Sequence, residues 1–151
     1  MQKLIIHADG SCNNKTGIGG WGAVIRTDPQ AKIKRLCGGY IKTTNNQMEL
    51  LAVIHALEWV TERGKYDIQL FSDSQYVIKG INEWSVGWMR NGWRTSAGLP
   101  VRNKDLWVSL CALKPKHRIA FAWVRGHNGD IYNEEADALA RTGACYPGDV
   151  K

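Results

Sequence analysis

The sequence contains no pair of cysteines close enough to form a Cys-x-x-Cys motif, which argues against a disulfide framework. A chain of 151 residues is also too large to need such cross-links, so we expect reduced, structural thiols. The four cysteines are Cys12, Cys37, Cys111 and Cys145.

Long apolar runs are also absent from the sequence. None reaches the length that a membrane-spanning helix needs. Residues 1–8 lack the basic, apolar and small-residue segments that together make a secretion signal. We therefore expect a cytoplasmic protein that does not bind membranes.

No internal repeat of solenoid length and no second block of composition divide the chain. We expect a single domain over residues 1–151, with a flexible tail at 146–151. The net charge of +6 and the isoelectric point near 9.3 favour a polyanionic partner such as nucleic acid. No long exposed heptad or apolar patch is evident in the sequence, so we expect a monomer without an obligate protein partner.

The spacing of apolar residues predicts an α/β fold. Three consecutive strands are followed by alternating helices and strands, which implies a mixed sheet with helices packed on its faces. The predicted strands are residues 4–8, 21–26, 33–41, 67–72 and 117–124. The predicted helices are residues 48–63, 74–84, 103–113 and 133–142, and the Gly- and Trp-rich stretch 85–101 is expected to be irregular.

Two aspartates, Asp9 and Asp73, are each expected where an apolar strand ends. Strand ends in an open α/β sheet are common ligand sites. Taken singly, an aspartate at a strand end is more often a turn former or a helix cap. Asp73 stands where it could cap the helix that follows.

Two further acids fall on helices. On a 3.6-residue period Glu49 shares a face with Val53 and Val60, which should point into the core. The alternative for Glu49 is a capping-box role near the start of its helix. For Asp137 the alternative is an ion pair with Arg141, four residues further along.

Together the four acids suggest a metal site that none indicates alone. Two strand ends and two helix faces could place the carboxylates of Asp9, Glu49, Asp73 and Asp137 around one point. Such hard oxygen ligands suit Mg²⁺, and a pair of these ions can catalyse phosphodiester hydrolysis. His127 follows the last predicted strand in a glycine-containing loop, where its imidazole could relay protons, although a loop histidine is usually only solvated.

Aromatic and basic residues are interleaved in the stretch after residue 83. Trp84 and Trp88 are four residues apart and share a helical face, and Trp93, Arg90 and Arg94 follow closely. The alternative is core packing, but exposed aromatic rings beside cations form a platform for sugars and phosphates. We therefore favour nucleic-acid contact for this stretch.

Five segments, taken in order, form a pattern known from one family. They are Asp9-Gly10-Ser11-Cys12, Thr43-Thr44-Asn45-Asn46-Gln47-Met48-Glu49-Leu50, Ser72-Asp73-Ser74-Gln75-Tyr76, Trp123-Val124-Arg125-Gly126-His127 and Asn133-Glu134-Glu135-Ala136-Asp137. Over nearly its full length the chain resembles the type 1 ribonuclease H family. The resemblance implies the ribonuclease H-like fold, with a five-stranded mixed sheet in the order 3-2-1-4-5 whose first three strands are antiparallel.

The resemblance also implies an activity and its residues. Members of the family are endonucleases that hydrolyse the RNA strand of RNA/DNA hybrids without reading base sequence, and they leave 5′-phosphate and 3′-hydroxyl ends. The four carboxylates become ligands of two Mg²⁺ ions, with Mn²⁺ as a possible substitute, and His127 becomes the mobile catalytic histidine. The implied substrate contacts are Cys12, Asn13, Asn46 and Gln75 to the RNA minor groove, Lys42, Thr44 and Asn103 to a DNA phosphate, Tyr76, Trp84 and Trp88 to deoxyribose, and Arg90 and Arg94 on a basic protrusion.

The chain departs from the family pattern in two places. Residues 14–20 replace a proline-containing glycine loop, so the resemblance does not extend to the side chains of Asn14 and Lys15. Residues 96–99 carry no lysine where many members do, so we expect weaker hybrid binding with a shallower salt dependence.

Two competing interpretations stay open on the sequence. One is a resolvase-like nuclease that acts on DNA, against which the Glu49 motif, Asn46 and Gln75 argue. The other is a noncatalytic hybrid-binding module, which would gain nothing from four acids that repel phosphate.

Overall fold

The computed structural model describes residues 1–126 and 129–146 of the chain. Five strands form one sheet in the order β3-β2-β1-β4-β5, in which β1, β2 and β3 are antiparallel while β4 and β5 run parallel to β1. The strands are β1 (Lys3–Cys12), β2 (Gly19–Asp28), β3 (Ile33–Tyr40), β4 (Asp67–Ser72) and β5 (Arg118–Trp123). The predicted fold class and strand order are confirmed.

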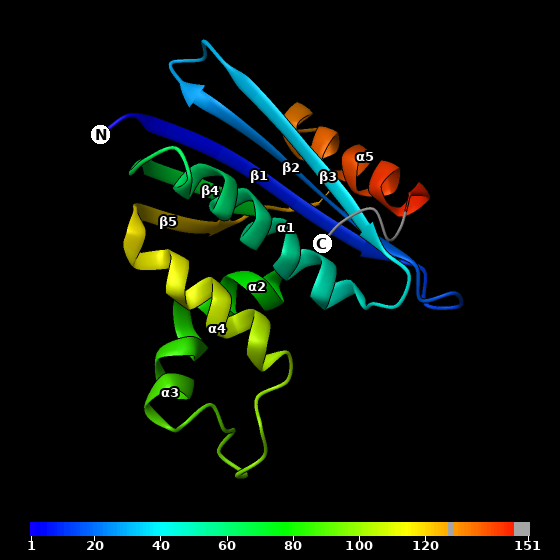
Figure 1. Cartoon of the computed structure of the whole chain (residues 1–151), viewed down its shortest axis with the longest axis vertical. Helices are drawn as coiled ribbons and strands as arrows, with labels where there is room; N and C mark the ends of the chain where they lie inside the picture. Colours follow the sequence, from blue (N-terminus) through cyan, green and yellow to red (C-terminus); the bar gives the residue numbers. More distant parts are fainter. Residues whose placement is uncertain (127–128, 147–151) are drawn as a thin grey trace.

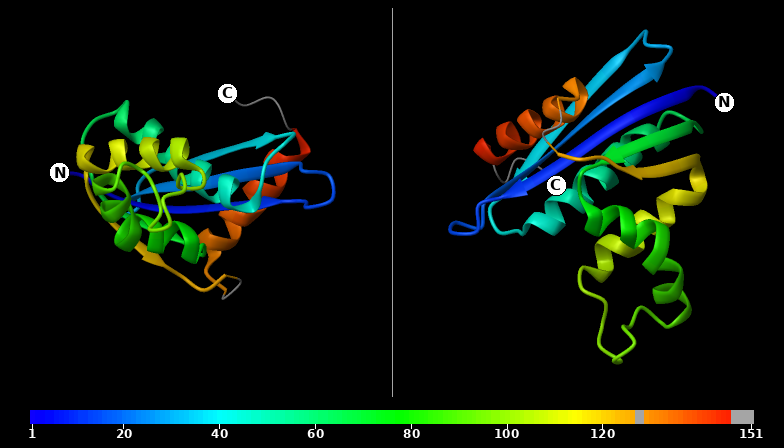
Figure 2. Two further views of the ribbon diagram at one scale, coloured as in Figure 1. Left: turned by 90° about the horizontal axis from the view of Figure 1, so that it is seen from below. Right: turned by 180° about the vertical axis from the view of Figure 1, so that it is seen from behind.

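Helices cover both faces of this sheet. Helix α5 lies across β1, β2 and β3 on one face, while α1 covers the other face together with α4 (Figures 1 and 2). The helices are α1 (Asn45–Thr61), α2 (Gln75–Lys79), the π-helix η1 (Gly80–Trp84), α3 (Ser85–Arg90), α4 (Lys104–Leu113), the 3-10 turn η2 (Lys114–Lys116) and α5 (Ile131–Cys145). Within the residues described, none of these helices is both long and apolar enough to cross a membrane.

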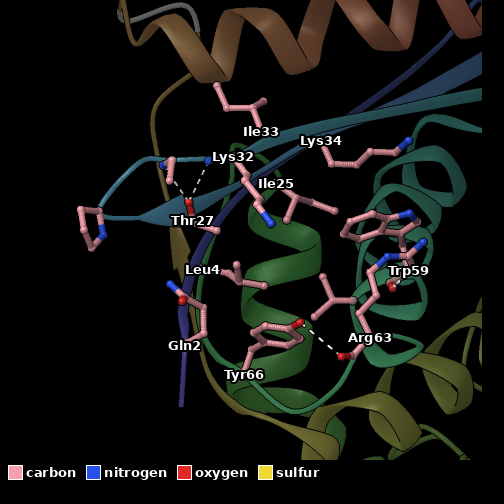
Figure 3. Close-up of a pocket in the computed structure, with 13 residues that line it drawn as sticks. Gln2, Leu4, Ile25, Thr27, Lys32, Ile33, Lys34, Trp59, Arg63 and Tyr66 are labelled. Atoms are coloured by element: carbon pink, nitrogen blue, oxygen red, sulfur yellow. Dashed lines mark hydrogen bonds between the residues drawn. The ribbon is translucent and has the colours of Figure 1, made fainter.

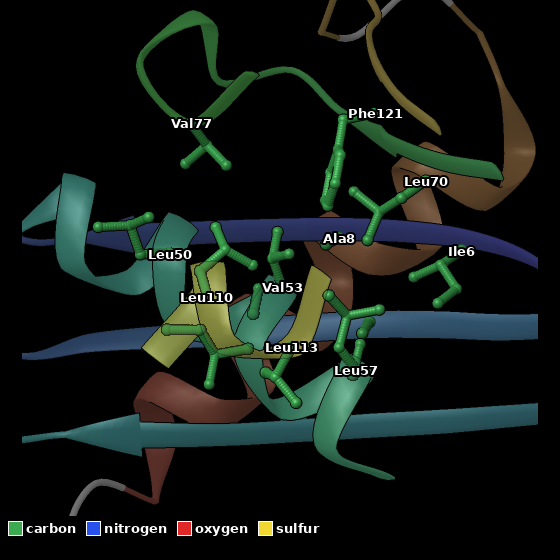
Figure 4. Close-up of a cluster of buried hydrophobic side chains, with 14 of the residues drawn as sticks. Ile6, Ala8, Leu50, Val53, Leu57, Leu70, Val77, Leu110, Leu113 and Phe121 are labelled. Atoms are coloured by element: carbon green, nitrogen blue, oxygen red, sulfur yellow. The ribbon is translucent and has the colours of Figure 1, made fainter. Parts of the chain in front are cut away.

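The main core lies between α1 and the sheet (Figure 4). Leu50, Val53 and Leu57 recur at helical spacing on α1 and are fully buried against Ile6 and Leu70 of the central strands. Burying each such side chain contributes about 1.5–3 kcal/mol, so this interface fixes where the first turn of α1 lies relative to β1.

Two predictions about local structure were wrong. Strand β1 does not end before Asp9, because Asp9 to Cys12 continue to pair with the residues Gly22 to Gly19 of β2. The stretch 85–101 is not irregular throughout, because Ser85–Arg90 is helical and the Ser85 hydroxyl donates to the Ile81 carbonyl from the preceding π-turn. In both places a pairing or packing contact overrides residues that locally favour a turn.

Helix α5 approaches the sheet closely because glycines lie beneath it. A Cβ atom on Gly22 would lie 2.5 Å from the Ala136 carbonyl oxygen and 2.6 Å from the Leu139 Cβ. Gly22 is also the direct partner of Asp9 across the antiparallel ladder. This glycine therefore lets the helix that carries Asp137 come down onto the strand that carries Asp9.

We predict that Gly22→Ala lowers the free energy of unfolding by about 1–3 kcal/mol, because the added methyl group overpacks the contact with α5. Gly87→Ala is the matched control, since a Cβ there meets nothing within 4 Å. A helical alanine should leave stability unchanged or raise it by about 0.5–1 kcal/mol. Urea unfolding of the two variants checks this, and equal losses in both would contradict it.

Candidate active site

Three carboxylates converge where the pairing of β1 with β4 ends. Asp9 comes from β1, Glu49 from the first turns of α1, and Asp73 follows β4 directly. Each offers an oxygen atom, and these atoms all lie within 4.8 Å of one another. Asp9 is only 7% exposed, while Glu49 and Asp73 are partly buried, so the cluster lies at the edge of the protein interior.

The main-chain amide of Gly10 holds two of these acids in place. It donates to Glu49 Oε1 at 2.7 Å and to Asp9 Oδ1 at 2.9 Å. A side chain cannot fit at this position, because a Cβ atom on Gly10 would lie 2.3 Å from the Met48 carbonyl carbon. Glycine here therefore lets the start of α1 pack directly on β1.

The alternative capping role of Glu49 is contradicted by the contacts of α1. Thr44 is the N-cap of that helix, and its hydroxyl accepts from the Gln47 amide. Glu49 lies beyond the capping-box position and bonds across to Gly10 instead. The Glu49 carboxylate therefore bonds to β1 and does not cap its own helix.

Asp73 is likewise not a helix cap. Ser74 caps α2, its hydroxyl accepting from the Val77 amide at 3.1 Å. The Trp123 indole N–H of β5 donates to the Asp73 carbonyl oxygen at 3.0 Å. A Cβ atom on Gly126 would lie 2.8 Å from Asp73 Oδ2, so the loop after β5 passes beside this carboxylate.

His127, which follows Gly126 directly, lies outside the residues that the structure describes. Its predicted role as a proton relay therefore stays a prediction.

The sequence did not predict the contact of Trp123 with Asp73, although Trp123 belongs to one of the five family segments.

Asp137 joins the group from α5. The predicted ion pair with Arg141 is present, and Asp137 is at the same time a neighbour of Asp9. Asp137 stands outside the tight group of three acids that the described residues form. Its carboxylate interacts with the cluster through Asp9.

The electrostatics of the cluster favour bound cations. Burial, followed by repulsion from Asp73 and Asp137, raises the pKa of Asp9 from 3.8 to about 8. Burial and the charges of Asp9 and Asp73 raise the pKa of Glu49 well above its usual range. Oxygen-only donors that repel one another when ionised fit hard cations such as Mg²⁺ or Mn²⁺, whose charge relieves the repulsion.

Comparison with known proteins identifies the family of this site. The family model described as RNase H matches residues 1–145. The chain is 49% identical over 144 residues to a Ribonuclease H of Xanthomonas campestris pv. campestris, covering 95% of this chain and 93% of that protein. The chain belongs to the RNase H family.

Solved structures agree with this assignment. LC9-RNase H1, a type 1 RNase H with the type 2 active-site motif, superimposes with a TM-score of 0.84 at 30% identity, covering 96% of this chain and 73% of that one. LC11-RNase H1 in complex with an RNA/DNA hybrid gives a TM-score of 0.71 at 20% identity, covering 94% and 96% of the two chains. At that identity the second likeness shows the shared fold.

The aromatic residues expected to contact deoxyribose in this RNase H form one connected group. The Tyr76 ring lies 6.3 Å from Trp84, and Trp84 lies 5.9 Å from Trp88. The Tyr76 hydroxyl accepts from the Trp107 indole at 3.0 Å and from the Asn103 amide at 3.1 Å. Trp107 is fully buried and supports the more exposed rings from below.

A pocket of about 530 Å³ adjoins these aromatics. Lys42, Gln47 and Asn103 line it, and the Gln47 side-chain amide donates to Asn103 Oδ1 at 3.3 Å. Lys104 also lines the pocket, and sequence reasoning had missed both Gln47 and Lys104. Thr44, expected beside Lys42 and Asn103, has its hydroxyl engaged as the cap of α1.

The residues expected to face the RNA lie around the start of α1 and α2. Asn46 and Gln75 are exposed on these helices. The Cys12 amide donates to Asn45 Oδ1 at 2.7 Å, while the Asn13 carboxamide oxygen accepts from two amides of its own loop. These bonds fix the shape of the loop that departs from the family pattern.

The two arginines of the basic protrusion lie on or after α3. Arg90 is exposed at the end of that helix, and the Arg94 guanidinium donates to the Gly98 carbonyl at 2.9 Å. In Figure 1 the segment from α3 to α4 extends away from the sheet. Both cations thus stand on the part of the molecule that projects furthest from the core.

A pocket of about 780 Å³ is separate from the carboxylate cluster. It lies at the opposite end of the central strands, where Leu4, Ile25 and Tyr66 form its apolar wall and Lys32 and Arg63 stand at its edge (Figure 3). None of the predicted site residues lines it.

We predict that the metal-free protein loses stability as pH rises from 3.8 to about 8, the interval between the ordinary and the folded-state pKa of Asp9. In this interval the folded protein keeps a proton that the unfolded chain has released, so each step up in pH favours unfolding. Glu49, whose pKa is also raised, contributes to the same loss. Asp9→Asn removes the Asp9 part of it and should stabilise the metal-free protein by about 0.5–2 kcal/mol near the upper end. Urea unfolding in EDTA across the interval measures it, and parallel curves for wild type and variant would refute it.

Proposed function

We propose that this protein hydrolyses the RNA strand of RNA/DNA hybrids, without reading base sequence, by a two-magnesium-ion mechanism that leaves 5′-phosphate and 3′-hydroxyl ends. The observation that carries the proposal is the partly buried cluster of Asp9, Glu49 and Asp73 with Asp137 beside it, in a chain of the RNase H family. Its curated relatives are named ribonucleases H, and LC11-RNase H1 has been solved with an RNA/DNA hybrid.

The four carboxylates would hold the cations, with Mn²⁺ as a substitute for Mg²⁺. Bound there, the ions supply Lewis-acid activation of water and stabilise charge on the leaving oxygen. The protein's own contribution is to orient the ligands. The Gly10 amide fixes Asp9 and Glu49, and the Trp123 indole fixes the main chain of Asp73. We assign the proton relay to His127.

Selection of the hybrid would come from reading the two strands differently. The 2′-hydroxyl both donates and accepts, so the side-chain amides of Asn46 and Gln75, with the main chain at Cys12 and Asn13, can recognise RNA independently of sequence. The DNA strand would be held by the rings of Tyr76, Trp84 and Trp88 and by a phosphate in the pocket of Lys42, Asn103 and neighbouring Thr44. Arg90 and Arg94 would add electrostatic attraction.

We further propose that the protein is a single-domain, cytoplasmic monomer without an obligate protein partner. The composition of the sequence and the spacing of its apolar residues support this proposal.

Cleavage of three end-labelled duplexes, RNA/DNA, RNA/RNA and DNA/DNA, tests the proposal. We expect Mg²⁺-dependent cutting confined to the RNA strand of the hybrid and none in EDTA. Asp9→Asn should reduce the rate roughly 10²–10⁴-fold, since several kcal/mol of charge stabilisation is lost. Asp28→Asn is the matched control, because it removes a carboxylate of the same sheet that pairs with Lys3 away from the cluster.

The other outcomes identify the competing activities. Equal cutting of DNA/DNA would favour a resolvase-like nuclease. Tight binding of the hybrid without cleavage, in a protein that still binds Mg²⁺, would favour a noncatalytic binding module.

A further inference from the structure

The N-terminal turn of α5 is held against the sheet by a stack of side chains that the proposed mechanism does not use. The buried His7 ring of β1 lies 5.1 Å from Phe71 of β4 and 5.8 Å from Tyr132 of α5. The Arg26 guanidinium of β2 lies 4.2 Å from the Tyr132 ring centroid on the same helix turn. We call these four residues the α5 clamp.

Polar contacts reinforce the α5 clamp. His7 Nε2 lies 3.7 Å from Asp130 Oδ2. Asp130 is the N-cap of α5, and its Oδ1 accepts from the main-chain amides of Tyr132 and Asn133 at 2.9 Å and 3.1 Å. The Tyr132 hydroxyl donates to Gln30 Oε1 at 2.7 Å. One strand residue thus contacts both the cap and the first turn of the helix.

The geometry links this clamp to the carboxylate cluster. His7 and Asp9 are two residues apart on β1, so their side chains point to the same face of the sheet, the one that α5 covers. They are about 6.6 Å apart along the strand. Tyr132 and Asp137 are separated on α5 by about 7.5 Å of helix. Tyr132 and Asp137 point about 140° apart around the helix, so the pairs His7 with Tyr132 and Asp9 with Asp137 lie on two flanks of the helix face that packs on the sheet.

The position of Asp137 depends on these contacts between β1 and α5 more than the positions of the other acids do. The other three cluster without it, and it interacts with the cluster through Asp9. The later part of α5 is held independently, because Ala136 and Ala140 lie directly on Gly22 and Gly20. Ala136 directly precedes Asp137, so loss of the α5 clamp should tilt the helix about the contact of Ala136 with Gly22 and turn Asp137 relative to Asp9 without detaching the helix.

We propose that Tyr132 and His7 are positioning residues that set the reach of Asp137 toward the metal site. The inference rests on the proposed function, since it assumes that the carboxylates bind Mg²⁺. Tyr132 contributes the aromatic ring on the helix. His7 contributes the ring that packs against it and the contact with Asp130 at the helix N-cap.

Mg²⁺ titration of the metal-free protein by calorimetry, beside hybrid cleavage at varied Mg²⁺, tests the proposal. We expect Tyr132→Ala to weaken Mg²⁺ binding and to raise the half-maximal Mg²⁺ concentration about 10–100-fold, as loss of a residue behind a metal ligand does. The KM for the hybrid should stay near the wild-type value. Tyr132→Phe keeps the ring and should restore both quantities.

The matched control is Tyr66→Ala. Tyr66 also packs on a histidine, with its ring 6.3 Å from that of His117, but it lies at the far end of the sheet beside the large pocket. It should lose stability without any change in Mg²⁺ binding. A Tyr132→Ala variant that behaves in the same way would overturn the proposal.

A double-mutant cycle separates positioning from general destabilisation. If Tyr132 acts through Asp137, then Tyr132→Ala should add no further loss of Mg²⁺ binding in an Asp137→Asn background. Additive losses would overturn the proposal. A wild-type protein that binds Mg²⁺ but does not cut the hybrid would defeat only the proposed function, whereas one that binds no Mg²⁺ would defeat both.

Discussion

A single main-chain amide, that of Gly10, organises the site. It donates to carboxylates from two different elements, Asp9 of β1 and Glu49 of α1, and it can do so only because no side chain separates the strand from the start of the helix. Two like charges brought together in this way repel each other, and burial strengthens the repulsion. The remaining structure supplies the free energy that keeps them together and brings the carboxylates of Asp73 and Asp137 beside them.

Packing on both faces of the sheet holds these carboxylates in place. On one face, Leu50, Val53 and Leu57 bury α1 against the central strands and so fix the turn that carries Glu49. On the other face, the close contact at Gly22 lowers α5 onto Asp9. A cluster of acids with raised pKa values lowers the stability of the metal-free protein, and a cation of the right size offsets that loss. We therefore propose that stability and metal binding are coupled through the same few side chains.

Much of this arrangement could be predicted from the sequence, and the exceptions share one cause. Helical spacing placed Glu49 toward the core, and the strand 67–72 was predicted with its observed bounds. Asp9 was misplaced at a strand end because Asp9-Gly10-Ser11 resembles a turn locally, whereas pairing with the distant Gly19 to Gly22 keeps it extended. The α5 clamp gave no local signal either, because His7 and Tyr132 meet only once the fold is complete. Contacts between residues far apart in sequence decided each case.

The most direct test of this account is the effect of Mg²⁺ on the unfolding of the free protein near pH 8, where burial and neighbouring carboxylates place the raised pKa of Asp9. The account predicts that added Mg²⁺ raises the free energy of unfolding of the wild type in proportion to the logarithm of its concentration above saturation. Glu49→Gln, which removes one ligand charge from the cluster, should largely abolish this rise. An equal response in both proteins, or none in the wild type, would contradict the claim that the carboxylates are held together for a cation.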